Sequence, residues 1–454
     1  MLDRVFQSID ARRSQSIAGL KDFLRIPSVS TKPEHAPDMR RCAEWLADQI
    51  RQTGLRATVE STPGHPIVLA ATDRKPGRPT ILLYGHYDVQ PPEPLEQWIT
   101  PPFEPTERGG AIYARGAVDD KGQVFAHLEA IRAWQQQGGL PVNLIALFEG
   151  EEEIGSDNLE NFLKQHRSDL AADLAVISDT GQFARGMPAI TYGLRGLVYM
   201  EIFITGPAFD LHSGMYGGAV PNPANVLAEL LATLHNRDGS ANIPGFYDDV
   251  LPLSKTERDQ FARLPHDDLK YMQELKIPGL YGEAGFSTLE RSWARPTCDI
   301  NGLTSGYQGP GAKTIIPAKA SAKVSMRLVP NQDPNKIEAA FIQAMRDRCP
   351  RTVTIEFAQH SLGSPVLVPL DGKPTQLAAA AIKQGFGADP VFIREGGSIP
   401  VVGQIKSILG IDTLLVGFGL PDDRVHSPNE KFDLDCFYHG TRTAAALYAQ
   451  LAKL

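Results

Sequence analysis

The sequence has little of what marks secreted, membrane-bound or nucleic-acid-binding proteins. Its 454 residues include four cysteines, which are far apart and form no CxxC or Cys/His cluster, so we expect reduced thiols in a cytoplasmic protein and no disulfide framework. No apolar run approaches the length of a membrane span, and the charged N-terminal residues 1–7 lack the apolar core of a signal peptide. The formal net charge is -8, and no basic stretch is interleaved with aromatic residues. Neither a membrane nor a nucleic acid is therefore an expected partner.

What the sequence does contain is a set of short apolar runs that end in acidic or histidine residues. These are residues 81–84 before His86 and Asp88, residues 144–148 before the acidic cluster 149–153, residues 174–177 before Asp179, and residues 414–418 before His426. Continuous apolar runs separated by helical stretches predict parallel strands that are buried on both faces. In such sheets the site lies at the carboxyl ends of the strands. The pattern therefore predicts a metal centre at that edge, of the kind found in two-metal hydrolases.

The period of the apolar residues divides the chain into three blocks. Residues 1–193 and 364–454 alternate strand and helix patterns, which is typical of βαβ units. Residues 194–363 contain strictly alternating strands and two helices in the order β-α-β-β-α-β, which is similar to a ferredoxin-like unit. Within this block, residues 237–296 are interrupted by Pro and Gly and are expected to form an irregular insertion. We predict an α/β protein whose mostly parallel-sheet catalytic domain, with helices on both faces, is interrupted by a smaller α+β ferredoxin-like lid and dimerisation domain.

The polar residues at the strand ends also have ordinary structural interpretations. His86 and Asp88 lie two positions apart on an extended run, so their side chains share a side. Asp88 could accept the ring N–H of a metal-bound His86, or the pair could be a structural hydrogen bond. Asp119 and Asp120 precede a helix, where aspartate is a common N-cap, although capping needs only one of them. The cluster 149–153 places four carboxylates together after an apolar run, which is unfavourable without a cation.

Taken together, these motifs resemble the dinuclear-zinc metallopeptidase family that includes carnosinases, cytosolic nonspecific dipeptidases, carboxypeptidase G and succinyl-diaminopimelate desuccinylase. The resemblance covers nearly the whole chain and is closest to the dipeptidase branch. The segments that carry it are residues 86–91 (HYDVQP), Trp98 with residues 101–103 (PPF), residues 191–196 (TYGLRG), residues 211–218 (LHSGMYGG) and residues 394–400 (REGGSIP).

The resemblance implies a site with two divalent metal ions. His86 and Asp179 would bind one ion, Glu153 and His426 would bind the other, and Asp119 would bridge both. Two imidazoles and three carboxylates suit Zn²⁺, and they also accommodate Mn²⁺ or Co²⁺. The resemblance further implies a cis peptide bond between Asp119 and Asp120.

The family pattern in the acidic cluster is two adjacent glutamates, one further residue, and then Gly and usually Ser. This pattern selects residues 152–156, which makes Glu152 the general base and Glu153 the ligand. Glu149 and Glu151 fall outside the pattern and are expected to be peripheral. Asp88 is expected to act in catalysis through His86.

The resemblance also implies a substrate-binding set in the middle block. His212 would help hold the developing oxyanion and would come from the partner subunit, so a homodimer is predicted, although a plain loop histidine is the alternative. Arg327 lies on the polar face of an alternating strand and would clasp the terminal carboxylate of the substrate, unless it is only a solvated charge. Thr314, Gly397 and Ser398 would line the same pocket.

The predicted activity is hydrolysis of the peptide bond of dipeptides or short peptides by a water shared between the metal ions. An aspartate at position 179 resembles the family's peptidases that act near a free amino terminus, whereas a glutamate is commoner in its deacylases and carboxypeptidases. An N-acyl-amino-acid amidohydrolase or a carboxypeptidase is the alternative enzyme. A catalytically silent binding protein on the same fold is a third reading, which the intact ligand set and Glu152 argue against.

Overall fold

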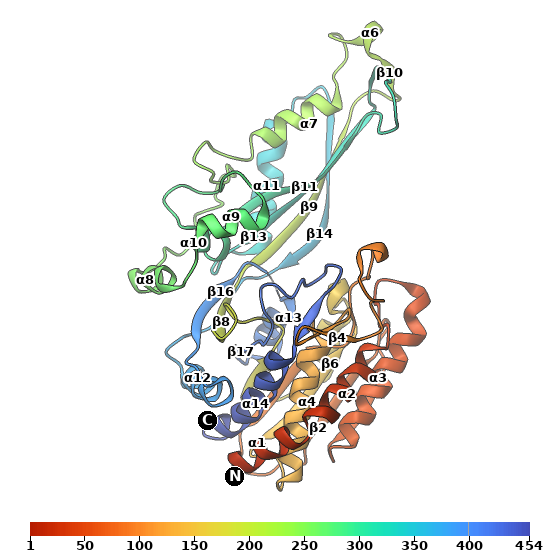
Figure 1. Ribbon diagram of the computed structural model, residues 1–454. Coiled ribbons are helices and arrows are strands. Elements are labelled where there is room, and N and C mark those ends of the chain that lie inside the picture. Colours follow the sequence, from red (N-terminus) through yellow and green to blue (C-terminus); the bar gives the residue numbers. More distant parts are fainter. Residues whose placement is uncertain (398) are drawn as a thin grey trace. The chain divides into compact units, whose positions relative to one another are not determined.

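The computed structural model describes residues 1–397 and 399–454, which form two compact units (Figure 1). Unit 1 comprises residues 1–192, 368–393 and 404–454, and unit 2 comprises residues 193–367 and 394–403. Each unit has its own hydrophobic core. The sequence places residues 394–403 in the second catalytic segment, whereas the structure groups them with unit 2.

A mixed β-sheet forms the centre of unit 1. Its strands follow the order β1 (Arg56–Glu60), β2 (Ile67–Ala71), β6 (Asn143–Glu149), β3 (Thr80–His86), β7 (Leu174–Ile177), β17 (Thr413–Leu415) and β8 (Ala189–Leu194). The four strands β6, β3, β7 and β17 are parallel, and the strands that flank them are antiparallel. Every residue of β3 and β7 is buried, as their continuous apolar runs predict.

Helices and a small second sheet complete unit 1. The main helices are α1 (Leu2–Ala11), α2 (Arg13–Leu24), α3 (Ala36–Arg51), α4 (Lys121–Gln136), α5 (Leu159–Gln165), α12 (Lys373–Phe386) and α14 (Leu434–Leu451). Helix α4 is buried along most of its length and packs against α14 and α1. Strands β4 (Thr106–Arg108), β5 (Ala111–Tyr113) and β18 (Lys431–Asp433) form a three-stranded antiparallel sheet. Among the described residues, no helix is both long and apolar enough to cross a membrane.

Unit 2 contains the predicted ferredoxin-like unit. The strands β9 (Gly196–Thr205), β11 (Thr297–Ser305), β13 (Lys319–Leu328) and β14 (Thr354–Gly363) form an antiparallel sheet in the order β11-β13-β9-β14. Helices α7 (Pro223–Ala232) and α11 (Pro334–Arg348) begin with Pro after an Asn or Asp cap, a strong helix-start signal. Both helices share a core with the buried side chains of β9 and β13. We call the other side of this sheet, which carries Arg327, its open face.

Three smaller features of unit 2 were not fully predicted. Residues 237–296 were expected to be irregular, but they contain the short helices α8 (Lys255–Arg263), α9 (Asp268–Leu275) and α10 (Thr288–Trp293). Capping boxes begin α8 and α10, so the helix signals were present in the sequence among the Pro and Gly residues. A separate ribbon pairs β10 (Leu211–His212) with β12 (Ile315–Ile316), and α6 (Ser213–Tyr216) follows β10. Strand β15 (Val366–Leu367) pairs with the last two residues of β8.

Candidate metal centre

The five predicted metal ligands all lie in unit 1, at or just beyond the ends of its central elements. His86 is the last residue of β3, Asp179 follows β7, and Asp119 lies just before α4. Glu153 lies in η3 (Glu152–Ile154), a single 3-10 turn that follows β6. His426 lies in the loop between β17 and β18 and has a left-handed backbone (φ 61°), which is uncommon for a residue other than glycine. Because the carboxyl ends of parallel strands meet at one edge, these loops converge there.

The distances divide these side chains into two groups that share Asp119. His86 Nε2 lies 3.2 Å from Asp119 Oδ1 and 3.8 Å from Asp179 Oδ2. His426 Nε2 lies 2.9 Å from Asp119 Oδ2 and 3.2 Å from Glu153 Oε2. Within each group, the candidate ligand atoms are within 4.8 Å of one another. The structure therefore brings all five residues together in the pairing that the resemblance implies, and the Asp119–Asp120 peptide bond is cis as expected.

The hydrogen bonds of His86 show why this arrangement suits a cation. The His86 ring is fully buried, and its Nδ1 lies 3.1 Å from the backbone oxygen of Asp88, to which it can donate a proton. The other nitrogen, Nε2, then presents a lone pair. Among the described residues this nitrogen has no hydrogen-bond donor, and it faces the carboxylates of Asp119 and Asp179. A lone pair turned toward two carboxylates is unfavourable unless a positive ion lies between them.

Asp88 differs in detail from its predicted role. Its carboxylate lies 3.4 Å from His86 Nδ1, farther than the backbone oxygen of the same residue. Its two oxygens instead accept the backbone N–H groups of Glu152 (3.2 Å) and Glu153 (3.1 Å). Asp88 thus contacts His86 through its main chain and fixes the turn that carries Glu152 and Glu153 through its side chain.

The electrostatics of the site follow from burial and from crowded carboxylates. The pKa of Glu152 is raised to about 8, mainly by burial, with Glu153 and Asp119 adding to the effect and His86 opposing it. Hydrogen bonds to Asp119 and Glu153 raise the pKa of His426 to about 10 against the effect of burial. Burial favours protonation of Asp119, but the hydrogen bond from His426 and the proximity of His86 outweigh it and hold the pKa of Asp119 well below its usual range. The site therefore concentrates negative charge that is only partly balanced by its two histidines.

Glu149 and Glu151 are not peripheral, because they hold the same turn in place. Glu149, the last residue of β6, accepts hydrogen bonds from the hydroxyls of Tyr84 on β3 (2.5 Å) and of Ser156 just after the turn (2.9 Å). Glu151 accepts the backbone N–H of His65 at 2.8 Å and the side-chain amide of Asn158. The family pattern could not reveal most of these contacts, because Tyr84, His65 and Asn158 lie outside it.

The sequence also gave no sign of the part played by Glu430. This carboxylate is fully buried and accepts the backbone N–H groups of Gly116 (3.0 Å), Val118 (3.0 Å) and Asp119 (3.2 Å). It also pairs with Arg115 Nη1 at 2.7 Å. Glu430 lies in the same loop as His426, so it ties the loop of one candidate ligand to the backbone of Asp119.

The predicted substrate-binding residues all belong to unit 2. His212 is the last residue of β10 and Thr314 directly precedes β12 in the same ribbon, where the Ser213 N–H donates to the Thr314 oxygen at 3.1 Å. His212 is exposed, and its Nδ1 accepts the Gly214 N–H at 3.0 Å, which leaves the ring proton on Nε2.

The other members of this set lie at the end of the four-stranded sheet. Arg327 is on the open face of β13, and the Gly397 oxygen accepts the Arg195 N–H at 3.1 Å. Arg195 is close enough to Arg327 that the second guanidinium lowers its pKa, and sequence reasoning missed this neighbour. Ser398 lies outside the described residues.

Comparison with known proteins gives consistent matches along nearly the whole chain. The sequence model of peptidase family M20/M25/M40 matches residues 82–450. The chain is 33% identical to the Cys-Gly metallodipeptidase dug1 of Schizosaccharomyces pombe, over 100% of its own length and 99% of that protein. It is 31% identical to the human Beta-Ala-His dipeptidase, over 100% of its own length and 93% of that protein.

Solved structures also match the chain over nearly its whole length. The crystal structure of human carnosine dipeptidase 1 matches with a TM-score of 0.87 at 31% identity and covers 100% of this chain and 99% of its own. The metallo-carboxypeptidase Sso-CP2 from Sulfolobus solfataricus matches with a TM-score of 0.89 at 33% identity and covers 97% of this chain and 99% of its own.

Proposed function

Because the chain belongs to peptidase family M20/M25/M40, we propose that it is a metal-dependent dipeptidase in which Glu152 is the general base. The main support is the pair of ligand groups that share Asp119, with Glu152 directly beside the ligand Glu153. The relatives in fission yeast and human that cover the whole chain are named as Cys-Gly and Beta-Ala-His dipeptidases. Dipeptides are therefore the substrate class that we assign to this site.

The proposal includes two divalent cations, for which we assign Zn²⁺ as the metal that suits this donor set, with Mn²⁺ and Co²⁺ also accommodated. His86, Asp119 and Asp179 would hold one ion, and Asp119, Glu153 and His426 would hold the other. When bound, the ions would polarise the scissile carbonyl and make a water molecule more acidic. The orphaned lone pair of His86 Nε2 and the crowded carboxylates support this fit.

Residues of the chain have the remaining roles in proton transfer, positioning and substrate binding. Glu152 takes a proton from the attacking water and delivers it to the leaving amine. Asp88 fixes the backbone of Glu152 and Glu153 in one turn, so the base and its neighbouring ligand keep a constant spacing. Arg327 clasps the terminal carboxylate of the substrate with its planar guanidinium. Gly397 is proposed to line the same pocket, and Thr314, which lies beside the His212 strand, is proposed to reach it together with His212. Ser398 has the same proposed role but lies outside the described residues.

We also propose a homodimer in which His212 of the partner subunit holds the oxyanion. In support, His212 lies on an exposed ribbon with the ring proton on Nε2, which suits it to donate to an oxyanion. The neighbouring apolar side chains of Phe209, Met215 and Tyr216 are 68%, 74% and 41% exposed, and exposed apolar groups of this size commonly mark an interface. Sedimentation analysis that finds only monomer at micromolar concentration would contradict the dimer.

We place the protein in the cytoplasm, where thiols stay reduced. All four cysteines are unpaired. Cell fractionation that recovers the protein outside the cytoplasm would overturn this assignment.

A substrate panel tests the proposed activity. The protein loaded with Zn²⁺ or Mn²⁺ should hydrolyse free-amine dipeptides, and a chelator should abolish the activity. A second candidate, carboxypeptidase activity, is favoured by the likeness to Sso-CP2, and the same panel includes N-acetylated dipeptides and longer peptides to separate the two. Faster cleavage of the blocked substrates than of their free-amine counterparts would replace dipeptidase with the amidohydrolase or carboxypeptidase function. The Glu152→Gln protein is the matched inactive control.

A further inference from the structure

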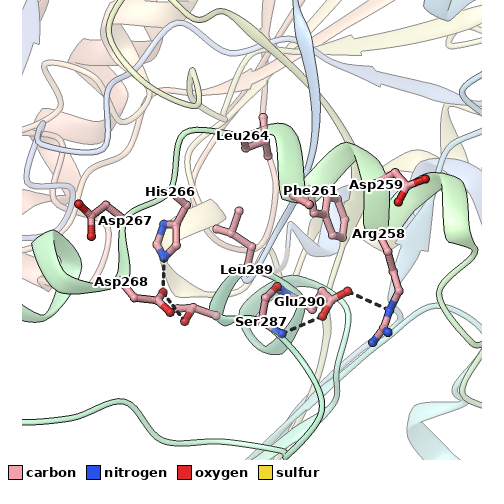
Figure 2. A pocket seen from close by; sticks show the side chains of 12 residues that line it. Arg258, Asp259, Phe261, Leu264, His266, Asp267, Asp268, Ser287, Leu289 and Glu290 are labelled. Carbon is pink, nitrogen blue, oxygen red and sulfur yellow. Dashed lines mark hydrogen bonds and ion pairs between the residues drawn. The ribbon is translucent and has the colours of Figure 1, made fainter.

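Unit 2 contains two pockets next to the insertion 237–296, and they differ in how their charges are paired. The first, shown in Figure 2, has a volume of about 580 Å³ and lies among α8, α9 and α10. Its polar groups already satisfy one another. Asp268 accepts hydrogen bonds from His266 Nε2 (3.1 Å) and the Thr288 hydroxyl (2.7 Å), and Arg258 pairs with Glu290 at 2.9 Å. The other two carboxylates of this pocket are also engaged, because Asp259 pairs with Lys255 at 2.7 Å and Asp267 accepts the backbone N–H groups of Leu269 and Lys270 at the start of α9.

The second pocket has a volume of about 360 Å³ and lies at the start of β11, near the open face of the sheet. In the antiparallel register, Arg327 on β13 is opposite Thr297, and Asp299 lies two positions farther along β11. Cross-strand partners and residues two apart project to the same side, so Arg327, Thr297 and Asp299 share the open face. Thr297, Asp299 and Arg195 line the pocket. The pocket therefore lies beside the residue that we expect to clasp the substrate carboxylate.

The charged groups around this pocket leave an excess of positive charge. Arg295 forms a two-point ion pair with Glu283, at 2.8 and 2.7 Å, and the two charges cancel. Arg291 donates to the backbone oxygen of Glu283 at 2.9 Å and so keeps its full charge. Arg195 uses its Nε to donate to the Gly396 oxygen, also at 2.9 Å. Neither of these two arginines has a carboxylate partner among the described residues.

The position of Arg195 beside Arg327 makes this excess unfavourable in the unliganded protein. The pKa of Arg195 is lowered to about 10, mainly by burial and also by the neighbouring Arg327, while Asp299 opposes both effects. Burial also lowers the pKa of Arg327, again opposed by Asp299. Asp299 therefore acts on both of these partly buried guanidinium groups. A bound anion would relieve their repulsion, and a carboxylate matches the planar fork of arginine.

The walls and the size of the pocket indicate which carboxylate would fit. Tyr271, Leu275, Ile277 and Leu280 supply an apolar lining beside the arginines. A volume of about 360 Å³ is at the low end of the range for small-molecule sites. These dimensions suit a short aliphatic chain that ends in a carboxylate.

We propose that this pocket receives the side chain of the C-terminal residue of the substrate and that Arg195 selects an acidic side chain there. The enzyme should therefore prefer dipeptides that end in Glu or Asp. This inference rests on the proposed function in one respect, because it takes Arg327 to hold the terminal carboxylate.

The test compares Ala-Glu, Ala-Gln and Ala-Ala as substrates of the zinc-loaded enzyme. Gln matches Glu in shape but lacks the charge, and a charge-assisted hydrogen bond makes kcat/KM for Ala-Glu about tenfold higher than for Ala-Gln. In the Arg195→Met protein this ratio should fall to about one, and Arg195→Lys, which lacks the fork, should give an intermediate ratio. Arg346→Met removes an exposed guanidinium from α11 in the same unit, and it should keep the wild-type ratio.

Two results would overturn the inference: a ratio near one in the wild-type enzyme, or an unchanged ratio in Arg195→Met. The wild-type comparison needs no substitution, so it remains decisive if a variant fails to fold. Cleavage of none of the three substrates would contradict the proposed function instead. In that case, calorimetric measurement of L-glutamate and L-glutamine binding tests whether the pocket prefers an acidic side chain. Tighter binding of glutamate that is lost in Arg195→Met supports the inference, and equal binding of both ligands refutes it.

Discussion

Replacing Glu430 with Gln should separate the stability of the fold from the affinity of the metal centre. One oxygen of Glu430 accepts the N–H groups of Val118 and Asp119, and the other accepts Gly116 N–H and Arg115 Nη1. A glutamine replaces one of these oxygens with an NH₂ group, which donates hydrogen bonds and cannot accept them. The two N–H groups that were bonded to that oxygen then lose their acceptor. Either Arg115 or the backbone of Asp119 loses its acceptor.

The expected magnitudes follow from the burial of this pair. Arg115 is 1% exposed and Glu430 is 0% exposed, and removal of one partner of a buried ion pair destabilises a protein by about 3–5 kcal/mol. Loss of a partner that orients a metal ligand commonly weakens metal binding by about 10–100-fold. Arg115→Met is the matched control. It breaks the same ion pair but leaves Glu430 to accept all three backbone N–H groups.

Both variants should therefore lose similar stability in urea unfolding of the metal-free protein. Zinc affinity, measured by competition with a chromophoric chelator, should fall in Glu430→Gln and stay near the wild-type value in Arg115→Met. Equal loss of zinc affinity in the two variants would mean that general destabilisation, and not the position of Asp119, controls the site. Zinc affinity of Glu430→Gln equal to wild type would refute the reasoning outright.

Three further predictions concern the base, a buried histidine and the dimer. Glu152→Gln should bind zinc almost normally while kcat falls by about 10²–10⁴-fold, whereas Glu153→Gln should lose zinc affinity in the chelator assay; the reverse pattern would exchange their roles. His127 is buried and donates from Nε2 to Ser178 (2.7 Å), whose hydroxyl donates onward to Val416, and burial lowers the His127 pKa from 6.5 to about 3. The neutral form of buried His127 therefore contributes fully to the free energy of unfolding above pH 6.5. This contribution should decline by up to about 1.4 kcal/mol per pH unit between pH 6.5 and 3. An equally steep decline in the stability of His127→Gln would contradict this explanation. Mixing inactive His212→Ala and Glu152→Gln proteins should restore part of the dipeptidase activity, because each mixed dimer has one site with both groups, and no recovery after verified subunit exchange would rule out sharing of His212.

The sequence by itself determined the fold class and the candidate ligand set. Apolar runs such as residues 81–84 and 174–177 are buried on both faces of the sheet, and the alternating residues of β9 and β13 have one buried face. These outcomes depend on backbone periodicity, which is local and can be read from a few consecutive residues. The position of the site could be predicted for a related reason, since strand ends in a parallel sheet meet at one edge, whereas the identity of each ligand was implied by the resemblance to the metallopeptidase family.

Tertiary structure alone decided how these ligands are supported. The Asp119 N–H donates to Glu430, which is 311 residues away in the chain, and the side chain of Asp88 serves the Glu152 turn more than the histidine beside it. The surplus charge at Arg195 likewise depends on neighbours from separate strands and from the insertion. The function of a buried carboxylate or guanidinium depends on which donors, acceptors and charges surround it. Those neighbours come from distant segments, and no local pattern in the sequence specifies them.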